Sequence, residues 1–162
     1  MTLTRTLIES IAIYANRRMA LMLVLGFASG MPLALCSTTL TAWMVTEGID
    51  IRTIGLYSLV GLPYALKFLW SPLMDRYVPP FLGRRRGWML ITQIALIGAI
   101  TALGFCNPAS RPVMVAFLAL GLAFFSASQD IVLDAYRTEL LAPVERGAGA
   151  GIWIMGYRLA IL

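Results

Sequence analysis

The stretch SPLMDRYVPPFLGRRRG, residues 71–87, decides the fold of this 162-residue chain. It joins two apolar segments through a short connection that holds one carboxylate, Asp75, and four arginines. Those arginines are Arg76, Arg84, Arg85 and Arg86. Short loops rich in Lys and Arg stay on the cytoplasmic side of a membrane. The stretch therefore predicts a cytoplasmic turn between two transmembrane helices.

The composition agrees with a membrane protein. Hydrophobic residues make up 59% of the chain and charged residues only 13%, whereas a soluble domain has about 25% charged residues. The net charge of +5 does not indicate nucleic-acid binding, because the basic residues gather at segment ends without an aromatic and basic stripe. Two cysteines, Cys36 and Cys106, provide no disulfide framework. We therefore interpret the charge as a determinant of membrane orientation.

Apolar segments cover residues 19–45, 53–71, 88–106, 112–133 and 147–162. About 20 helical residues cross a hydrocarbon core of about 30 Å. Four segments are long enough, and the fifth holds only 16 residues before the chain stops at Leu162. The sequence predicts an all-α, polytopic membrane helix bundle of about five transmembrane helices, the last of them truncated.

Basic and less basic connections alternate along the chain. Arg5, Arg17 and Arg18 precede the first span, whereas the third-to-fourth connection holds only Arg111. This asymmetry predicts a cytoplasmic N-terminus. Apolar residues recur at helical spacing before the first span, which favours a short helix over residues 2–16 on the membrane surface. We expect a cytoplasmic interfacial segment over residues 1–18 and a partial helix bundle over residues 19–162.

The first span carries residues that are unusual for a plain membrane helix. Gly26 and Gly30 are four apart, which allows another helix to approach closely, and Pro32 interrupts the backbone hydrogen bonding. The two glycines favour either the packing of a static helix bundle or a helix that moves during function. The hydroxyl-bearing residues that follow are candidates for lining a hydrated path, and they are Ser37, Thr38, Thr39 and Thr41.

Ionisable residues inside the spans point to function, because a charge near the bilayer centre costs roughly 2.5 to 3.5 kcal/mol. Lys67 and Asp130 fall at similar depths and can form a pair, with snorkelling of Lys67 as the alternative. We assign both to proton coupling, with Lys67 modulating the ionisation of Asp130. Arg158 lies about 16 Å deep. It requires a ligand anion, a water cavity or a partner from a helix outside this sequence.

The fourth segment carries a polar stripe at helical spacing, formed by Ser126, Asp130, Asp134 and Arg137 and bordered by Gln129. Asp134 and Arg137 are three apart and can form a structural ion pair. Asp130 lies one turn deeper and is the candidate proton site, because the chain contains no histidine. We predict that Arg158, Gln129 and Ser126 bind substrate. No metal or other cofactor is expected.

Several phrases together resemble a known family. They are LGFASGMPLAL at residues 25–35, TAWM at 41–44, KFLWSPLMDRYVPPFLGRRRGW at 67–88, SASQDIVLDAY at 126–136 and ERGAGAG at 145–151. They look like the N-terminal part of the AmpG family of muropeptide permeases, which is related to acetyl-CoA transporters and lies within the major facilitator superfamily.

The resemblance implies proton-coupled import of anhydromuropeptides across the bacterial inner membrane for cell-wall recycling. The ligand would be N-acetylglucosaminyl-1,6-anhydro-N-acetylmuramic acid with or without its peptide, and its import would influence beta-lactamase induction. Transporters of this superfamily have two six-helix halves. The chain would then be a fragment whose partners include the missing C-terminal half, the lipid bilayer, the muropeptide and protons.

The resemblance also implies a gate at the cytoplasmic helix ends. The superfamily motif in this connection usually has glycine at the position of Ser71. We expect a gating and structural charge network formed by Asp75, Arg76, Arg84, Arg85, Arg86, Asp134, Arg137, Glu139 and Arg146.

Two other functions compete with transport. A structural helix bundle without transport activity predicts no continuous polar face, whereas the stripe here is continuous. An intramembrane prenyltransferase holds magnesium and a pyrophosphate between two aspartate-rich motifs. This chain has one such motif, Asp130 and Asp134, so the enzyme interpretation is the weaker of the two.

Overall fold

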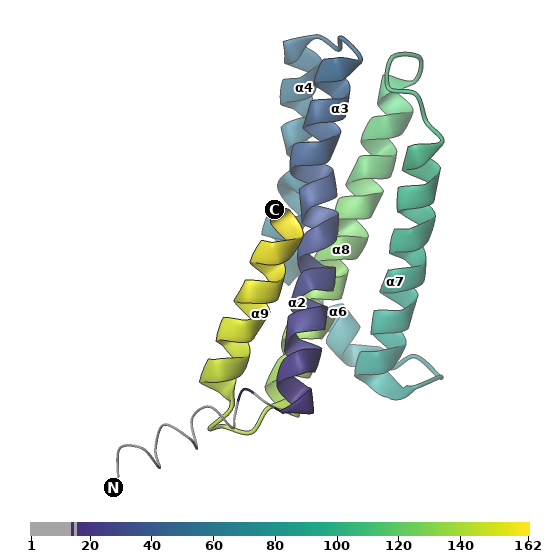
Figure 1. Cartoon of the computed structure of the whole chain (residues 1–162). Helices are drawn as coiled ribbons and strands as arrows, with labels where there is room; N and C mark the ends of the chain where they lie inside the picture. Colours follow the sequence, from purple (N-terminus) through teal and green to yellow (C-terminus); the bar gives the residue numbers. More distant parts are fainter. Residues whose placement is uncertain (1–13, 15) are drawn as a thin grey trace, which may run out of the picture. The chain divides into compact units, whose positions relative to one another are not determined.

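A computed structural model describes residues 14 and 16–162, except for the side chain of Leu56. The interfacial helix expected over residues 2–16 and most of the segment 1–18 lie outside the described residues. The α-helices are α2 (Arg17–Ala34), α3 (Leu40–Thr46), α4 (Ile51–Tyr57), α5 (Leu62–Leu66), α6 (Ser71–Arg76), α7 (Gly83–Gly104), α8 (Pro112–Leu140) and α9 (Arg146–Ile161) (Figure 1).

Within the described part of the chain, three helical stretches are long and apolar enough to cross a membrane. They cover Arg17–Thr46 with 30 residues, Gly83–Gly104 with 22 and Pro112–Leu140 with 29. The first of them combines α2, a π-helical turn at Leu35–Thr39 and α3. Helix α9 has 16 residues. The predicted all-α membrane helix bundle is confirmed.

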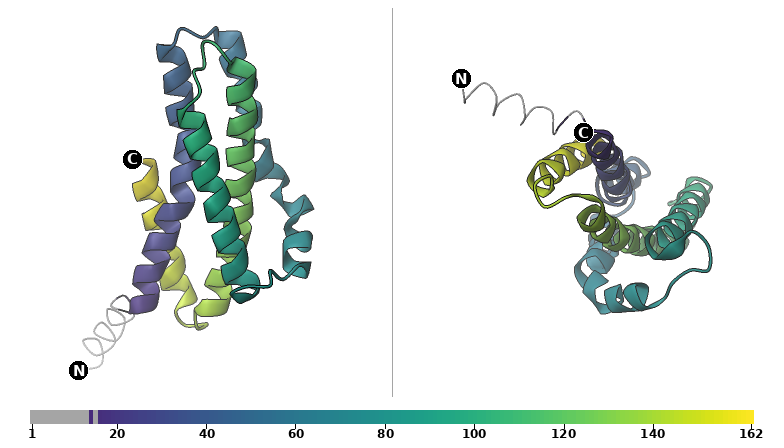
Figure 2. Two further views of the ribbon diagram at one scale, coloured as in Figure 1. Left: turned by 90° about the vertical axis from the view of Figure 1, so that its right-hand side faces the viewer. Right: turned by 90° about the horizontal axis from the view of Figure 1, so that it is seen from below.

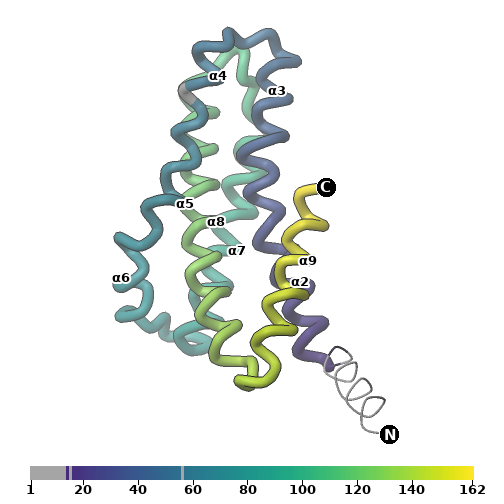
Figure 3. The backbone as a smooth tube through the Cα atoms, turned by 90° about the vertical axis from the view of Figure 1, so that its left-hand side faces the viewer, coloured from purple at the N-terminus to yellow at the C-terminus, as the bar shows by residue number. Residues whose placement is uncertain are grey.

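The second expected span is not one helix. The structure replaces the helix expected over residues 53–71 with α4, α5 and α6, joined by 3-10 turns at Ser58–Gly61 and Lys67–Leu69. Figure 3 shows that these pieces follow one another along a single irregular course. Pro63 and Pro72 lie in the first turns of α5 and α6. Since proline has no backbone N–H, it fits a first turn but breaks a helix interior.

The first span keeps Pro32 inside α2 and changes to the π-helical turn three residues later. Its hydroxyls bond to the helix itself, because Ser37 Oγ donates to the carbonyl of Leu33 at 2.8 Å and Thr38 Oγ1 to that of Ala34 at 2.9 Å. Local bonds of this kind satisfy a hydroxyl without any partner helix. The expected hydrated path along these residues stays a prediction.

The chain divides into two compact units, and the first contains Met1–Met31 and Asp134–Leu162. In this unit α2 and α9 lie side by side (Figures 1 and 3). Gly30 is so close to α9 that an added Cβ would lie 2.7 Å from the carbonyl oxygen of Tyr157, and Gly26 is closer still to that of Trp153. The close helix approach predicted from Gly26 and Gly30 is confirmed, and its partner is α9.

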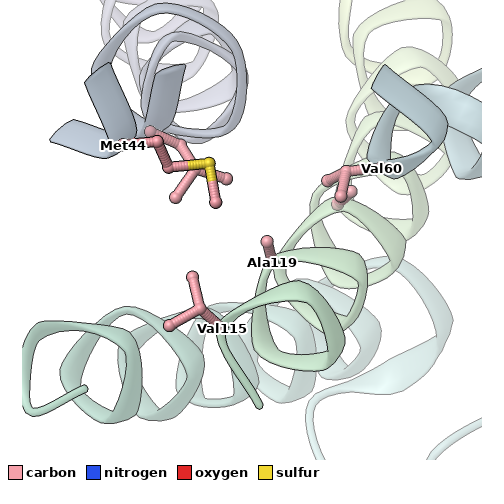
Figure 4. Packing of buried hydrophobic residues seen from close by; sticks show 6 residues of the cluster. Met44, Val60, Val115 and Ala119 are labelled. Carbon is pink, nitrogen blue, oxygen red and sulfur yellow. The ribbon is translucent and has the colours of Figure 1, made fainter. Parts of the chain in front are cut away.

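The second unit, Pro32–Leu133, packs through larger side chains. Helices α7 and α8 lie side by side in it, as Figure 2 shows. The side chains of Met44, Val60, Val115 and Ala119 come from α3, the broken segment and α8 and meet in a buried cluster (Figure 4). This cluster fixes the broken segment against α8, which carries the polar residues discussed next.

Candidate functional site

The polar residues in the middle of α8 are buried. Ser126, Ser128 and Gln129 are 1%, 4% and 3% exposed. The amide oxygen Oε1 of Gln129 accepts no hydrogen bond within the described part of the chain. A buried carbonyl oxygen without a donor costs free energy, so such an atom calls for water, a ligand or a donor from another segment. Two of the three predicted substrate-binding residues, Ser126 and Gln129, therefore lie one turn apart on a buried face.

A tryptophan connects the broken segment to another side of α8, because Ser128 lies about 200° around the helix from Ser126. Nε1 of Trp70 donates a hydrogen bond to Oγ of Ser128 at 3.1 Å, and that hydroxyl donates to the carbonyl of Phe124 at 2.8 Å. The rings of Trp70 and Phe124 pack with their centroids 4.9 Å apart. Sequence reasoning missed both Trp70 and Ser128. A signal for this contact was present in the sequence. Trp70 has an N–H and Ser128 a hydroxyl, and in apolar segments each of these groups needs a hydrogen-bond partner.

Lys67 and Asp130 are both partly buried. The expected Lys67–Asp130 ion pair is not formed, because Lys67 pairs with no carboxylate of the described residues. The expectation assumed a continuous α-helix over residues 53–71. Lys67 instead begins a 3-10 turn, whose three residues per turn and longer rise change the direction and the height of the side chain. Proton coupling through Asp130 and Lys67 stays a prediction.

At the end of α8 the predicted pair is present. Nη2 of Arg137 lies 3.2 Å from Oδ1 of Asp134, three residues earlier on the same helix. The guanidinium carbon of Arg137 also lies 5.3 Å from the centre of the Trp153 ring on α9. This cation–π contact fixes the arginine against α9. Both contacts of Arg137 therefore lie inside the first unit, and a structural role of the pair stays a prediction.

Glu145 forms a cluster that sequence reasoning missed. Its Oε2 accepts hydrogen bonds from Nη1 of Arg18 at 3.0 Å and from the N–H of Ala142 at 3.2 Å, while Oε1 accepts one from Nδ2 of Asn16 at 3.0 Å. The hydrogen bond from Ala142, followed by that from Arg18, lowers the pKa of Glu145. The cluster joins the start of α2 to the α8–α9 connection. Arg146, a predicted network member, instead donates from Nη2 to the carbonyl of Thr138 at 3.4 Å.

The connection between α6 and α7 contains a direct ion pair. Nη1 of Arg85 lies 2.6 Å from Oδ1 of Asp75, and Nη1 of Arg84 donates to the carbonyl oxygen of Asp75 at 3.4 Å. Arg76 and Arg86 are exposed and form no ion pair or side-chain hydrogen bond with any described residue. The structure therefore brings together only part of the expected arginine network. Glu139 is exposed near the end of α8.

Arg158 is exposed on α9. Its side chain has no ion-pair or hydrogen-bond partner among residues 14 and 16–162. The nearby residues Tyr157 and Ala160 face Gly30 of α2. The packed side of α9 is thus occupied by small and aromatic residues, while Arg158 lies outside the contact. Its role in substrate binding stays a prediction.

Comparison with known proteins agrees with this architecture. The family model of acetyl-coenzyme A transporter 1 matches residues 18–112. The chain is 59% identical over 154 residues to the anhydromuropeptide permease of Escherichia coli strain K12, covering 95% of this chain and 31% of the relative. It is 49% identical over 145 residues to an uncharacterized protein of Haemophilus influenzae, covering 90% of this chain and 34% of the relative.

A third relative is a Rickettsia bellii protein that is provisionally named AmpG 1 transporter. It is 36% identical over 151 residues, covering 91% of this chain and 37% of the relative. The chain thus spans about a third of the length of these relatives. The functional names among them are those of a permease and a transporter, which are not enzymes. Since the family model matches more than half of the chain, the chain belongs to the AmpG/acetyl-coenzyme A transporter family.

Proposed function

We propose that this chain is part of a secondary transporter that imports anhydromuropeptides across the bacterial inner membrane by proton symport. The observation that carries the proposal is the 59% identity, over 95% of the chain, to a protein named anhydromuropeptide permease. The chain spans 31% of that relative. Transporters of the facilitator type bind substrate between two helix bundles, so the complete binding cavity includes helices that this chain does not supply.

The buried polar face of α8 supports a role in substrate binding. Oε1 of Gln129 is a buried acceptor without a donor in the described residues, and Ser126 lies one turn away at 1% exposure. The hydroxyl groups of a saccharide can donate hydrogen bonds to such an acceptor. We assign Gln129 and Ser126 to contacts with the sugar hydroxyls, and Asp130, on the same helix, to the proton step with Lys67 as its modulator.

Uptake of radiolabelled anhydromuropeptide into membrane vesicles that contain the protein at its natural length tests this proposal. An imposed proton gradient should drive accumulation above the external concentration. The Asp130→Asn variant should lose this accumulation and keep exchange of labelled for unlabelled ligand, because exchange needs binding and alternating access but no net proton movement. The matched control is Asp50→Asn, in the α3–α4 connection, which should keep both activities.

Three outcomes of this experiment are informative. No uptake by the wild-type protein, despite correct insertion, would refute the transport function. Accumulation that does not depend on the proton gradient would refute symport. Gradient-driven accumulation by Asp130→Asn would move the coupling carboxylate to another residue.

Arg158 is the proposed anchor for a carboxylate of the peptide-bearing ligand. A guanidinium holds a carboxylate through two parallel hydrogen bonds, and this one has no partner among the described residues. Arg158→Lys keeps the charge but loses the paired donors, so uptake of the peptide-bearing ligand should fall more than uptake of the peptide-free disaccharide. Equal loss for both ligands would leave two explanations, a contact with the muramyl carboxylate or a structural ion pair with another helix. Rescue by charge reversal at an acidic residue of that helix would decide for the ion pair.

The Asp75–Arg85 pair is the proposed brace of a gate at the cytoplasmic helix ends, since it connects α6 to α7. This assignment requires a cytoplasmic N-terminus, as the distribution of arginines predicts. A cysteine replacing Pro80 should then be shielded from an impermeant thiol reagent added to intact spheroplasts, while one replacing Glu47 should react. The reverse pattern would overturn the orientation.

A further inference from the structure

The connection between α6 and α7 exposes an unusual cluster of large apolar side chains. Tyr77, Val78, Phe81 and Leu82 are 61%, 60%, 61% and 63% exposed. They lie within six consecutive residues of a connection between helices, where polar residues are usual. An exposed apolar cluster with a charged border marks a surface that binds another protein or a membrane.

The first turns of α7 contact the backbone of this connection. Nε1 of Trp88 donates a hydrogen bond to the carbonyl of Tyr77 at 2.9 Å. An added Cβ on Gly87 would lie 2.7 Å from the carbonyl oxygen of Phe81 and 2.8 Å from Cβ of Pro79, which is itself buried. The start of α7 therefore packs directly against the loop backbone. These contacts hold the loop at Tyr77, Pro79 and Phe81 against the start of α7.

The backbone at the end of the loop is in a conformation that leucine rarely adopts. Leu82 has φ 63° and Gly83 has φ 76°, so two successive residues are left-handed. Glycine adopts this conformation easily, but a residue with a branched side chain does so at an energetic cost. Strain of this kind persists where the surrounding structure enforces it, and it concentrates at binding sites. Here it places the Leu82 side chain on the exposed side of the turn.

Two free guanidinium groups flank the apolar cluster. Arg76 ends α6 and Arg86 lies in the first turn of α7. Both are exposed, and neither pairs with a carboxylate within the described part of the chain. Arg85, between them in sequence with Arg84, is instead fixed on Asp75. The geometry of a guanidinium fits the oxygens of a phosphate group through paired hydrogen bonds.

We propose that residues 76–86 form an interfacial anchor that binds anionic phospholipid. Tyr77, Val78, Phe81 and Leu82 insert at the boundary between head groups and acyl chains, and Arg76 and Arg86 hold the lipid phosphate. A lipid fits better than a protein partner, because α7 begins at Gly83 and is long and apolar enough to cross a membrane. The loop therefore lies where a membrane helix meets the head groups. The anchor does not depend on which substrate the protein transports.

The depth of the loop can be measured with a fluorescent label. Phe81→Cys, in a protein at its natural length that carries Cys36→Ala and Cys106→Ala and no other accessible cysteine, is labelled with an environment-sensitive dye. The protein is placed in nanodiscs of phosphatidylcholine and phosphatidylglycerol. Spin-labelled lipid should quench the dye, and iodide in the water should not. The matched control is Ala109→Cys in the exposed α7–α8 connection, where iodide should quench.

Two results of this measurement overturn the proposal. Quenching by iodide at Phe81→Cys, as strong as at Ala109→Cys, would show that the loop lies in water. Shielding from both iodide and spin-labelled lipid would show that protein covers the loop.

The charge preference is tested separately in detergent by thermal unfolding. Phosphatidylglycerol should raise the melting temperature more than phosphatidylcholine does, because a ligand that binds only the folded state stabilises it. Inorganic phosphate alone should not reproduce the effect. Combined Arg76→Gln and Arg86→Gln substitutions should weaken apparent phosphatidylglycerol affinity roughly tenfold. Combined Arg52→Gln, in the first turn of α4, and Arg111→Gln, in the α7–α8 connection, should not. Equal stabilisation by both lipids, or unchanged affinity of the Arg76 and Arg86 variant, would refute the phosphate contact.

Discussion

Helices α2 and α9 in the unit of Met1–Met31 and Asp134–Leu162 approach until their backbones meet, whereas the unit Pro32–Leu133 fills the space between helices with side chains. In the first unit, glycines at positions 26, 30 and 156 remove the side chains that would separate the helices. In the second, Met44, Val60 and Val115 form a buried cluster. The contact between α2 and α9 should therefore tolerate no added atom. The buried cluster of the second unit should lose stability only gradually as atoms are removed from its side chains.

The largest effect is expected from one methyl group added to the glycine contact. In Gly156→Ala the new Cβ would collide with the carbonyl oxygen of Leu23 and lie 3.0 Å from the backbone N of Phe27. Since these are backbone atoms, they cannot rotate away, and we expect a loss of about 3 kcal/mol, at the upper end of overpacking costs. Reversible unfolding in mixed micelles measures this loss.

The matched control for that substitution is Gly98→Ala in α7, where an added Cβ meets no atom within 4 Å. Alanine favours a helix over glycine by roughly 0.5–1 kcal/mol, so this variant should be as stable as the wild type or more so. Similar destabilisation of both variants would contradict the idea that backbone contact distinguishes the first unit.

A smaller effect is expected from a cavity in the second unit. Met44 is 0% exposed and packs in the cluster of Figure 4. Met44→Ala should cost about 2 kcal/mol, because the lost contacts are replaced by a cavity that the neighbours fill only partly. Unfolding in the same micelles provides the measurement, and Val45→Ala, at a side chain that is 60% exposed, is the control. A loss for Met44→Ala larger than for Gly156→Ala would reverse the comparison.

The smallest effect is expected at Glu145, which joins the start of α2 to the α8–α9 connection in the first unit. Hydrogen bonds from Ala142 and then Arg18 lower the pKa of Glu145, so the folded state binds this proton less tightly than the unfolded state. The stability contributed by the carboxylate is therefore fully present above the usual glutamate pKa of about 4.3 and is lost as the pH falls through the lowered value.

Melting temperatures recorded between neutral and acidic pH measure this contribution. Glu145→Gln should destabilise the protein slightly at neutral pH and should show a weaker loss of stability on acidification than the wild type. Glu47→Gln, at an exposed residue of the α3–α4 connection, should keep the wild-type pH dependence. An unchanged pH dependence in Glu145→Gln would show that the cluster does not contribute.

The candidate site was predictable where the interaction is local. Asp134 and Arg137 are three apart on one helix, and this spacing alone brings their charges within 3.2 Å. Asp75 and Arg85 are separated by one short turn, and they also pair. By contrast, Arg18 and Glu145 are 127 residues apart, so no local spacing could have indicated their contact. Trp70 and Ser128 were missed for the same reason.

The apolar helices with arginines at their ends could be predicted from the amino-acid sequence alone, because hydropathy and charge act on each segment separately. The close approach at glycines 26 and 30 was likewise predictable. That α9 is the helix that approaches became clear from the packing of the helices, because a bare backbone surface accepts any partner of complementary shape. The tertiary structure also decided the position of Lys67, since the breaks at Pro63 and Pro72 change the helix geometry and the packing of Val60 against α8 sets its course. Pairing between distant segments depends on how all the helices pack, and no single segment contains that information.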